Sequence, residues 1–125
     1  MANIEASLKF GYLVENSTRE HTWFSDEPAD AGGTDKAAKP TEYLLSALAS
    51  CMIITVKMYA NRKEWKLDDI IVSLKILDKG EKVLIEKRIR FQGVLDEKQQ
   101  KRLLDISGRC PVAKMLANSV DFKLV

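Results

Sequence analysis

The chain has 125 residues, of which 46% are hydrophobic and 30% are charged, and its formal net charge is +2 at neutral pH. These values are typical of a single globular domain over residues 1–125 and exclude a disordered chain. The small, evenly spread charge gives no reason to expect nucleic acid or a membrane surface as the partner. The N-terminal residues lack the basic and then apolar segments of a signal peptide, so we expect a cytoplasmic protein.

The first quarter of the chain predicts a β-hairpin followed by a long loop. Apolar residues alternate over residues 4–14, which predicts a half-buried strand. The polar residues 15–18 predict a turn, and residues 20–25 predict the returning strand. Residues 26–39 are rich in Asp, Pro and Ala and contain Gly32-Gly33, which predicts a loop, and loops of this length are often functional.

A long helix is predicted next. Pro40 fits a first helical turn, where its missing N–H costs nothing. Residues 43–56 carry no charge and are apolar on nearly every side, which predicts a buried helix that ends near Asn61. This uncharged run of about fourteen residues is shorter than the roughly twenty that a membrane span needs. We therefore expect a long buried central helix and no membrane partner.

The following segment predicts a second hairpin. Apolar residues alternate over residues 70–76, and residues 83–91 predict the return strand. Residues 78–81 predict the turn, with Gly80 available for positive φ. The other face of the return strand is expected to be solvated, since it carries Glu86, Arg88 and Arg90.

The C-terminal part predicts two helices and a strand. Asp96 and Gln99 have the spacing of a capping box, and Gly108 is expected to end the helix that they begin. Cys110-Pro111 predicts the start of a further helix, and the alternating residues 120–124 predict a closing strand. The predicted order is ββαββααβ, which is an α+β fold.

The two cysteines differ in context. Cys51 lies in the middle of the predicted central helix, where its simplest role is that of a small buried hydrophobic residue. Burial would raise its pKa unless a cation or dipole offset this effect. Cys110 lies at a predicted helix N-cap next to Arg109, and both the helix dipole and the arginine would favour a thiolate. A plain capping or packing role is the alternative for Cys110.

Other uses of the cysteines are disfavoured. In a reducing cytosol the two are not expected to form a permanent structural disulfide. The chain has one histidine and no closely spaced cysteine pair, so no metal site is predicted.

Two motifs resemble those of a known family. Residues 40–51, preceded by Gly32-Gly33-Thr34-Asp35, resemble the signature of the OsmC/Ohr family of osmotically induced and organic hydroperoxide resistance proteins. Residues 110–114 resemble the segment around that family's second cysteine. The likeness covers nearly the whole chain, including the order of elements and the spacing of the cysteines. The chain is most similar to the broader OsmC-like subgroup.

The resemblance implies a fold, an assembly and a reaction. Members form an intertwined homodimer in which both subunits build each active site and bury the central helices. Cys51 would be the peroxidatic thiolate and Cys110 the resolving thiol. The sulfenic acid formed on Cys51 would condense with Cys110 to a disulfide, which a dithiol, lipoyl-type in the Ohr branch, would reduce. No cofactor is implied, and apolar surroundings of Cys51 favour an organic hydroperoxide over hydrogen peroxide.

The family also uses an arginine from the first hairpin, held by a glutamate at the helix start. Arg19 and Glu42 are the candidates here. Glu42 lies nine residues before Cys51, whereas the Ohr branch has its glutamate ten before, where this chain has Thr41. One helical position is a rotation of about 100°, so we expect this pairing to be altered or absent.

Simpler explanations remain open for the residues of the first hairpin. Arg19 could be a solvated turn residue. His21 is expected to be a paired or partly buried strand residue, with a role in the site as the alternative. Trp23 and Phe24 are expected in the core or in a dimer interface.

Two other functions compete with the peroxidase. One is a non-catalytic OsmC-like protein that binds a small apolar ligand or a thiol compound at the dimer cleft, and Thr41 in place of a glutamate favours it. The other is a KH-like nucleic-acid module, suggested by the C-terminal βααβ order. The absence of a Gly-x-x-Gly loop and of a basic-aromatic stripe disfavours this second alternative.

Overall fold

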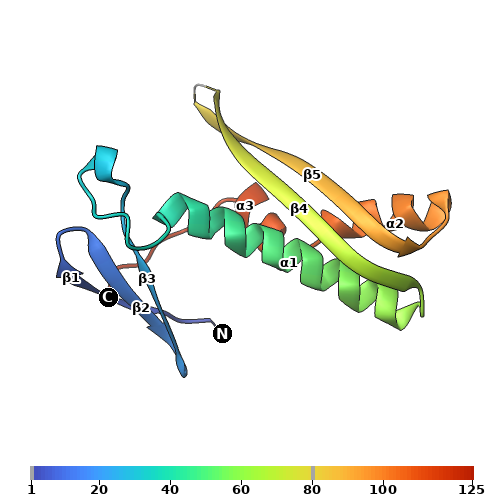
Figure 1. Ribbon diagram of the computed structural model, residues 1–125, viewed down its shortest axis with the longest axis horizontal. Helices are drawn as coiled ribbons and strands as arrows, with labels where there is room; N and C mark the ends of the chain where they lie inside the picture. Colours follow the sequence, from blue (N-terminus) through green and yellow to red (C-terminus); the bar gives the residue numbers. More distant parts are fainter. Residues whose placement is uncertain (1, 80) are drawn as a thin grey trace. The chain divides into compact units, whose positions relative to one another are not determined.

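The computed structural model describes residues 2–79 and 81–125, and the side chains of all of these except Asp78 and Lys79. Its contacts divide the chain into two compact units, one up to Leu44 and one from Leu45 onward, and each is described by itself. Figure 1 shows the elements of both units. The mixed α+β composition is as predicted.

The first unit is built on a three-stranded antiparallel sheet. Its strands are β1 (Glu5–Phe10), β2 (Leu13–Thr18) and β3 (His21–Ser25), in the order β1-β2-β3. The prediction of one long strand followed by a turn at residues 15–18 is therefore wrong. The chain turns at Gly11-Tyr12 and again at Arg19-Glu20, and Gly11 (φ 54°) and Arg19 (φ 51°) adopt the left-handed conformation that tight hairpin turns use.

The predicted half-burial of the first strand is also absent from the single chain. All six residues of β1 are exposed. Alternation of apolar residues shows that a strand has an apolar face, but burial requires another element to cover that face.

The loop after β3 closes around Asp26. This carboxylate is buried and accepts hydrogen bonds from the Thr34 hydroxyl (2.5 Å) and from the backbone N–H groups of Glu27 (2.7 Å) and Lys36 (3.2 Å). The loop includes the short 3₁₀-helix η1 (Ala29–Ala31). Glycine is required at position 33, because a Cβ there would lie 2.0 Å from the Glu27 carbonyl oxygen. Gly33 and Thr34 of the first motif therefore hold the loop together.

The central helix α1 (Pro40–Arg62) begins at Pro40 as predicted and continues from the first unit into the second. Its start is capped by Glu42, whose Oε1 accepts a hydrogen bond from the Lys39 N–H (3.0 Å). This is one half of a capping box. The Tyr43 hydroxyl donates a hydrogen bond to the Phe24 carbonyl (2.5 Å), which ties the helix start to β3.

Only one stripe of α1 is buried in the chain. It recurs every four residues and consists of Leu48, Met52, Val56 and Ala60. Other apolar side chains of the helix are exposed, Ile54 by 57% and Met58 by 66%. The prediction of burial on all sides is therefore wrong for the single chain.

Among the described residues, α1 is also long and apolar enough to cross a membrane, but core helices of soluble proteins meet the same criteria, so this is weak evidence.

The second unit is a two-layer arrangement of a hairpin and helices. Strands β4 (Lys66–Lys79) and β5 (Lys82–Val94) pair along their whole length as predicted, while the turn residue Gly80 lies outside the described residues. Their apolar face packs against α1, α2 (Glu97–Ser107) and α3 (Pro111–Ala117). Glu86, Arg88 and Arg90 on the other face are exposed, as expected. The main core consists of Val56, Ala60, Leu67, Ile70, Leu103 and Ile106.

The two C-terminal helices form as predicted, but the closing strand does not. Asp96 and Gln99 form a complete capping box at the start of α2, Gly108 ends that helix, and Cys110 is the N-cap of α3. Residues 118–125 form no strand, and Phe122 and Leu124 are 94% and 99% exposed. A strand needs a neighbour for its backbone hydrogen bonds, and no described segment pairs with this one. The observed order is therefore βββαββαα.

We predict that Leu103→Ala lowers the free energy of unfolding by about 2–5 kcal/mol, because it leaves a cavity at a fully buried position. The matched control is Leu104→Ala on the same helix, which removes a side chain that is 53% exposed. It should cost about 0.5 kcal/mol or less. Urea unfolding measures both, and equal losses would contradict the assignment of the core.

A second prediction concerns Asp26. The hydrogen bond from Thr34, with those from the Glu27 and Lys36 backbone, lowers the pKa of this carboxyl although burial opposes the shift. A lowered folded-state pKa gives stability that is present above the unfolded pKa of about 3.9 and is lost as pH falls through the folded value.

Asp26→Asn should therefore melt below the wild type near neutral pH, and the difference should shrink on acidification through the folded pKa. Thermal melts of both proteins across this range measure the effect. A difference in melting temperature that does not change with pH would contradict the role of the ionised carboxylate.

Candidate functional site

The two cysteines come together within the second unit. Cys51 lies in the middle of α1 and Cys110 precedes the first turn of α3. Cys110 is 0% exposed and forms a buried cluster with Leu48 and Met52, and the half-buried Cys51 packs against the same cluster. Both are free thiols. We call Leu48, Met52, Cys51 and Cys110 the thiol cluster.

The surroundings of the thiol cluster are apolar. The side chains packed against it come from both strands of the hairpin and from α3 and are Val72, Leu74, Ile85, Ile89, Val112 and Ala113. The two thiols therefore lie in a low-polarity environment.

The electrostatics of Cys110 differ from the sequence prediction. Burial is the main cause that raises the pKa of the Cys110 thiol, and the neighbouring Cys51 adds to this effect. The Ala113 N–H, which donates to Cys110 Sγ at 3.4 Å, opposes the shift without overcoming it. Burial therefore disfavours the thiolate that the sequence predicts at this helix start.

Arg109 does not act on Cys110 as expected, because it is engaged elsewhere. Its Nη2 pairs with Asp105 Oδ2 at 2.8 Å. The same carboxylate oxygen pairs with Arg102 Nη1 (3.0 Å), and Arg102 Nε donates to the Tyr59 hydroxyl (3.0 Å). This network was not predicted from the sequence, although the i,i+4 spacing of Asp105 and Arg109 is a signal for such a pair.

Tyr59 is the centre of a cationic group of side chains. Arg62, Lys63 and Arg102 lie over its ring at 5.6, 5.7 and 5.4 Å from the centroid. The hydrogen bond from Arg102 is the main cause that lowers the pKa of the Tyr59 phenol. Trp65 contacts the same ring edge-on, and both aromatic side chains pack against the main core.

Arg19 and Glu42 both belong to the first unit, whereas the cysteines belong to the second. Arg19 is exposed in the β2–β3 turn, and Glu42 caps α1. Within the described part of the chain no ion pair joins the two side chains. His21 is paired with Thr18 and exposed, Trp23 is half-buried and Phe24 is exposed.

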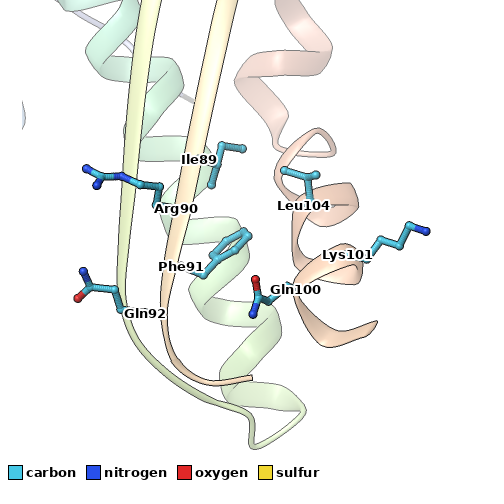
Figure 2. Close-up of a pocket in the computed structure, with 7 residues that line it drawn as sticks. All are labelled: Ile89, Arg90, Phe91, Gln92, Gln100, Lys101 and Leu104. Carbon is cyan, nitrogen blue, oxygen red and sulfur yellow. The ribbon is translucent and has the colours of Figure 1, made fainter. Parts of the chain in front are cut away.

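A separate hollow of about 480 Å³ lies between β5 and α2 (Figure 2). Its apolar lining residues are Ile89, Phe91 and Leu104, and its polar ones are Arg90, Gln92, Gln100 and Lys101. The side chains of Arg90 and Gln92 point away from α2 (Figure 2). Neither cysteine lines this hollow. Across residues 2–79 and 81–125, no three His, Cys, Asp or Glu side chains are grouped as metal ligands would be.

Comparison with known proteins identifies the family. The model of the family described as OsmC-like protein matches residues 33–125, which is most of the chain and includes both cysteines. No curated protein matches the chain.

Solved structures with the same fold span nearly the whole chain. An OsmC-like protein from Mycoplasma pneumoniae has a TM-score of 0.80 at 20% identity, over 93% of this chain and 86% of its own. An organic hydroperoxide resistance protein OsmC from Legionella pneumophila has a TM-score of 0.70 at 18% identity, over 95% and 90%.

A third structure, the organic hydroperoxide resistance protein OhrB of Bacillus subtilis, has a TM-score of 0.67 at 18% identity, over 97% of this chain and 93% of its own. At these identities the structures show the fold, while the family model covers the sequence motif and the thiol cluster. The chain belongs to the OsmC/Ohr family.

Proposed function

We propose that this protein is a cysteine-based peroxidase that reduces organic hydroperoxides in defence against oxidative stress. The observation that carries the proposal is the thiol cluster, in which Cys51 and Cys110, from distant parts of the sequence, pack together among apolar side chains. The hydroperoxide resistance proteins of Legionella pneumophila and Bacillus subtilis, which share the fold, support this substrate class.

The two cysteines have different roles in this reaction. Cys51 is half-buried and thus reachable by a substrate, so it is the peroxidatic residue. Its thiolate attacks the distal oxygen of the hydroperoxide, the O–O bond breaks, and an alcohol leaves with the other oxygen. Cys110 then attacks the Cys51 sulfenic acid, water leaves, and an S–S bond forms. A dithiol, lipoyl-type or other, reduces this disulfide by thiol–disulfide exchange.

The apolar walls of the site select the substrate. Each CH₂ group of a hydroperoxide tail that is buried against them contributes about 0.8 kcal/mol. Hydrogen peroxide has no such group. The preference should therefore rise with the size of the hydrocarbon part.

We also propose that the 1–125 chain works as a single OsmC-like domain in a homodimer in the cytoplasm. The exposed apolar side chains of α1, among them Ile54 and Met58, need a cover that the chain itself does not supply. Residues 120–124 alternate as a strand does and lack a neighbouring strand. A second copy could supply both, and a reducing cytosol would keep the two thiols free.

A non-catalytic protein that binds a small apolar ligand or a thiol compound in the same site is the second candidate. It is favoured by Glu42, whose carboxylate is engaged in capping α1 and is not paired with Arg19. The two candidates differ in whether hydroperoxide is consumed.

The decisive assay measures consumption of cumene hydroperoxide with dihydrolipoamide as reductant. We predict turnover by the wild type and its loss in Cys51→Ser, because this variant lacks the nucleophile. Without reductant, Cys110→Ser should consume one equivalent of peroxide per chain and then stop, because this variant has no internal thiol to resolve the sulfenic acid. Wild-type protein without turnover, or Cys51→Ser with turnover, would contradict the peroxidase and leave the binding protein.

A further prediction concerns the activation of the Cys51 thiol. We propose that Arg19 stabilises the Cys51 thiolate and that Glu42 positions the Arg19 side chain. Arg19→Ala should slow oxidation of Cys51 by roughly 10²-fold, as loss of one electrostatic donor does in other enzymes. Glu42→Gln keeps an oxygen for the Lys39 N–H, so it should preserve the melting temperature but slow the reaction.

Stopped-flow measurement with stoichiometric peroxide gives these rates, and Glu20→Ala in the same turn is the matched control. An unchanged rate in Arg19→Ala would show that Arg19 is only a solvated turn residue.

A further inference from the structure

The two sulfurs of the thiol cluster differ in access. The Cys110 side chain is 0% exposed and lies against Leu48 and Met52, while Cys51 is half-buried. A disulfide between them would present two sulfur atoms to a reductant, and only one would be reachable without opening the core. Thiol–disulfide exchange depends on which sulfur the attacking thiolate can approach.

We propose that the reductant attacks the sulfur of Cys51, so that the mixed disulfide forms on Cys51 and Cys110 is the leaving group. The proposal rests on the Cys51–Cys110 disulfide of the proposed function. It adds the direction of the reductive step, which assigns Cys51 Sγ as the atom that receives the reductant.

The step balances as two exchanges. One thiolate of the dithiol forms an S–S bond to Cys51 Sγ, the Cys51–Cys110 bond breaks, and Cys110 leaves with the electron pair and takes up a proton. The second thiol of the reductant, as its thiolate, then attacks its own sulfur in the mixed disulfide. This releases the Cys51 thiolate, and the dithiol is oxidised to a cyclic disulfide while the protein disulfide is reduced.

A backbone hydrogen-bond donor favours Cys110 as the leaving group. A leaving thiol of high pKa slows exchange, and burial raises the pKa of Cys110. However, the Ala113 N–H at the start of α3 already donates to Cys110 Sγ at 3.4 Å. The donor is therefore in place where negative charge develops as the S–S bond breaks. Access and the fixed donor together favour Cys110 as the leaving sulfur.

Attack in the alternative direction, on Cys110, has neither an accessible sulfur nor, among the described residues, a hydrogen-bond donor to the leaving sulfur. Attack on Cys110 would require a thiol to enter between α1, α3 and the hairpin, because Val112 and Ala113 also pack against the cluster. Cys51 would then leave, and no described N–H donates a hydrogen bond to its sulfur.

The test maps the first adduct. Wild-type protein is oxidised with cumene hydroperoxide, loss of both free thiols is verified, and the disulfide is exposed briefly to the monothiol glutathione. Acid quenching, alkylation of the freed thiol and peptide mass mapping then locate the glutathione. We expect at least about tenfold more adduct on Cys51 than on Cys110, given the dependence of exchange on access.

Equal adducts, or more on Cys110, would overturn the proposed direction while leaving the peroxidase intact. If oxidation by the peroxide formed no disulfide between the two cysteines, the proposed function and this inference would both fail. The two failures are distinguished at the first stage of the experiment.

A pair of variants tests whether burial is the cause. Val112→Ala removes part of the cover of Cys110, whereas Leu116→Ala on the same helix removes a side chain that is 45% exposed. The share of adduct on Cys110 should rise in Val112→Ala and stay at the wild-type value in Leu116→Ala. The same share in all three proteins would contradict burial as the determinant.

Discussion

The packing of α1 and α3 against one face of the β4–β5 hairpin is the constraint on which the site depends. It places Leu48, Met52 and Cys110 in one buried cluster and holds Cys51 beside it. Because the cluster is apolar, it raises the cost of charge on Cys110 and favours hydrocarbon over water. In the peroxidase that we propose, the same packing distinguishes the roles of the two thiols and favours an organic hydroperoxide as substrate.

Burial and local helix electrostatics compete at Cys110, and burial prevails. The residue is an N-cap before a helix of only seven residues, and its neighbour Arg109 is held by Asp105. A rule based on sequence position assigns a thiolate to such a cysteine. The rule fails here because sequence position does not reveal how far the thiol is removed from water. The fold is needed to decide between the two effects.

Local signals predicted much of the fold. Pro40, the Asp96–Gln99 capping box and Gly108 fixed helix ends correctly, because caps depend on neighbouring residues. The turns at Gly11 and Arg19 were missed, because strict alternation of apolar residues continues through the first turn. Burial of α1 and the strand at residues 120–124 depend on what packs against them, which alternation and composition do not specify. The two motifs identified both cysteines, while the capping role of Glu42 and the engagement of Arg109 required the structure.

In the function that we propose, Cys51 and Cys110 act as one redox pair within a chain. The most direct test of this pairing is mass mapping of protein treated with one equivalent of cumene hydroperoxide and digested without reductant. We expect loss of both free thiols and a single peptide pair, joined through Cys51 and Cys110, in protein that migrates as an uncrosslinked chain. Retention of a free Cys110, or a covalent dimer through either cysteine, would contradict it.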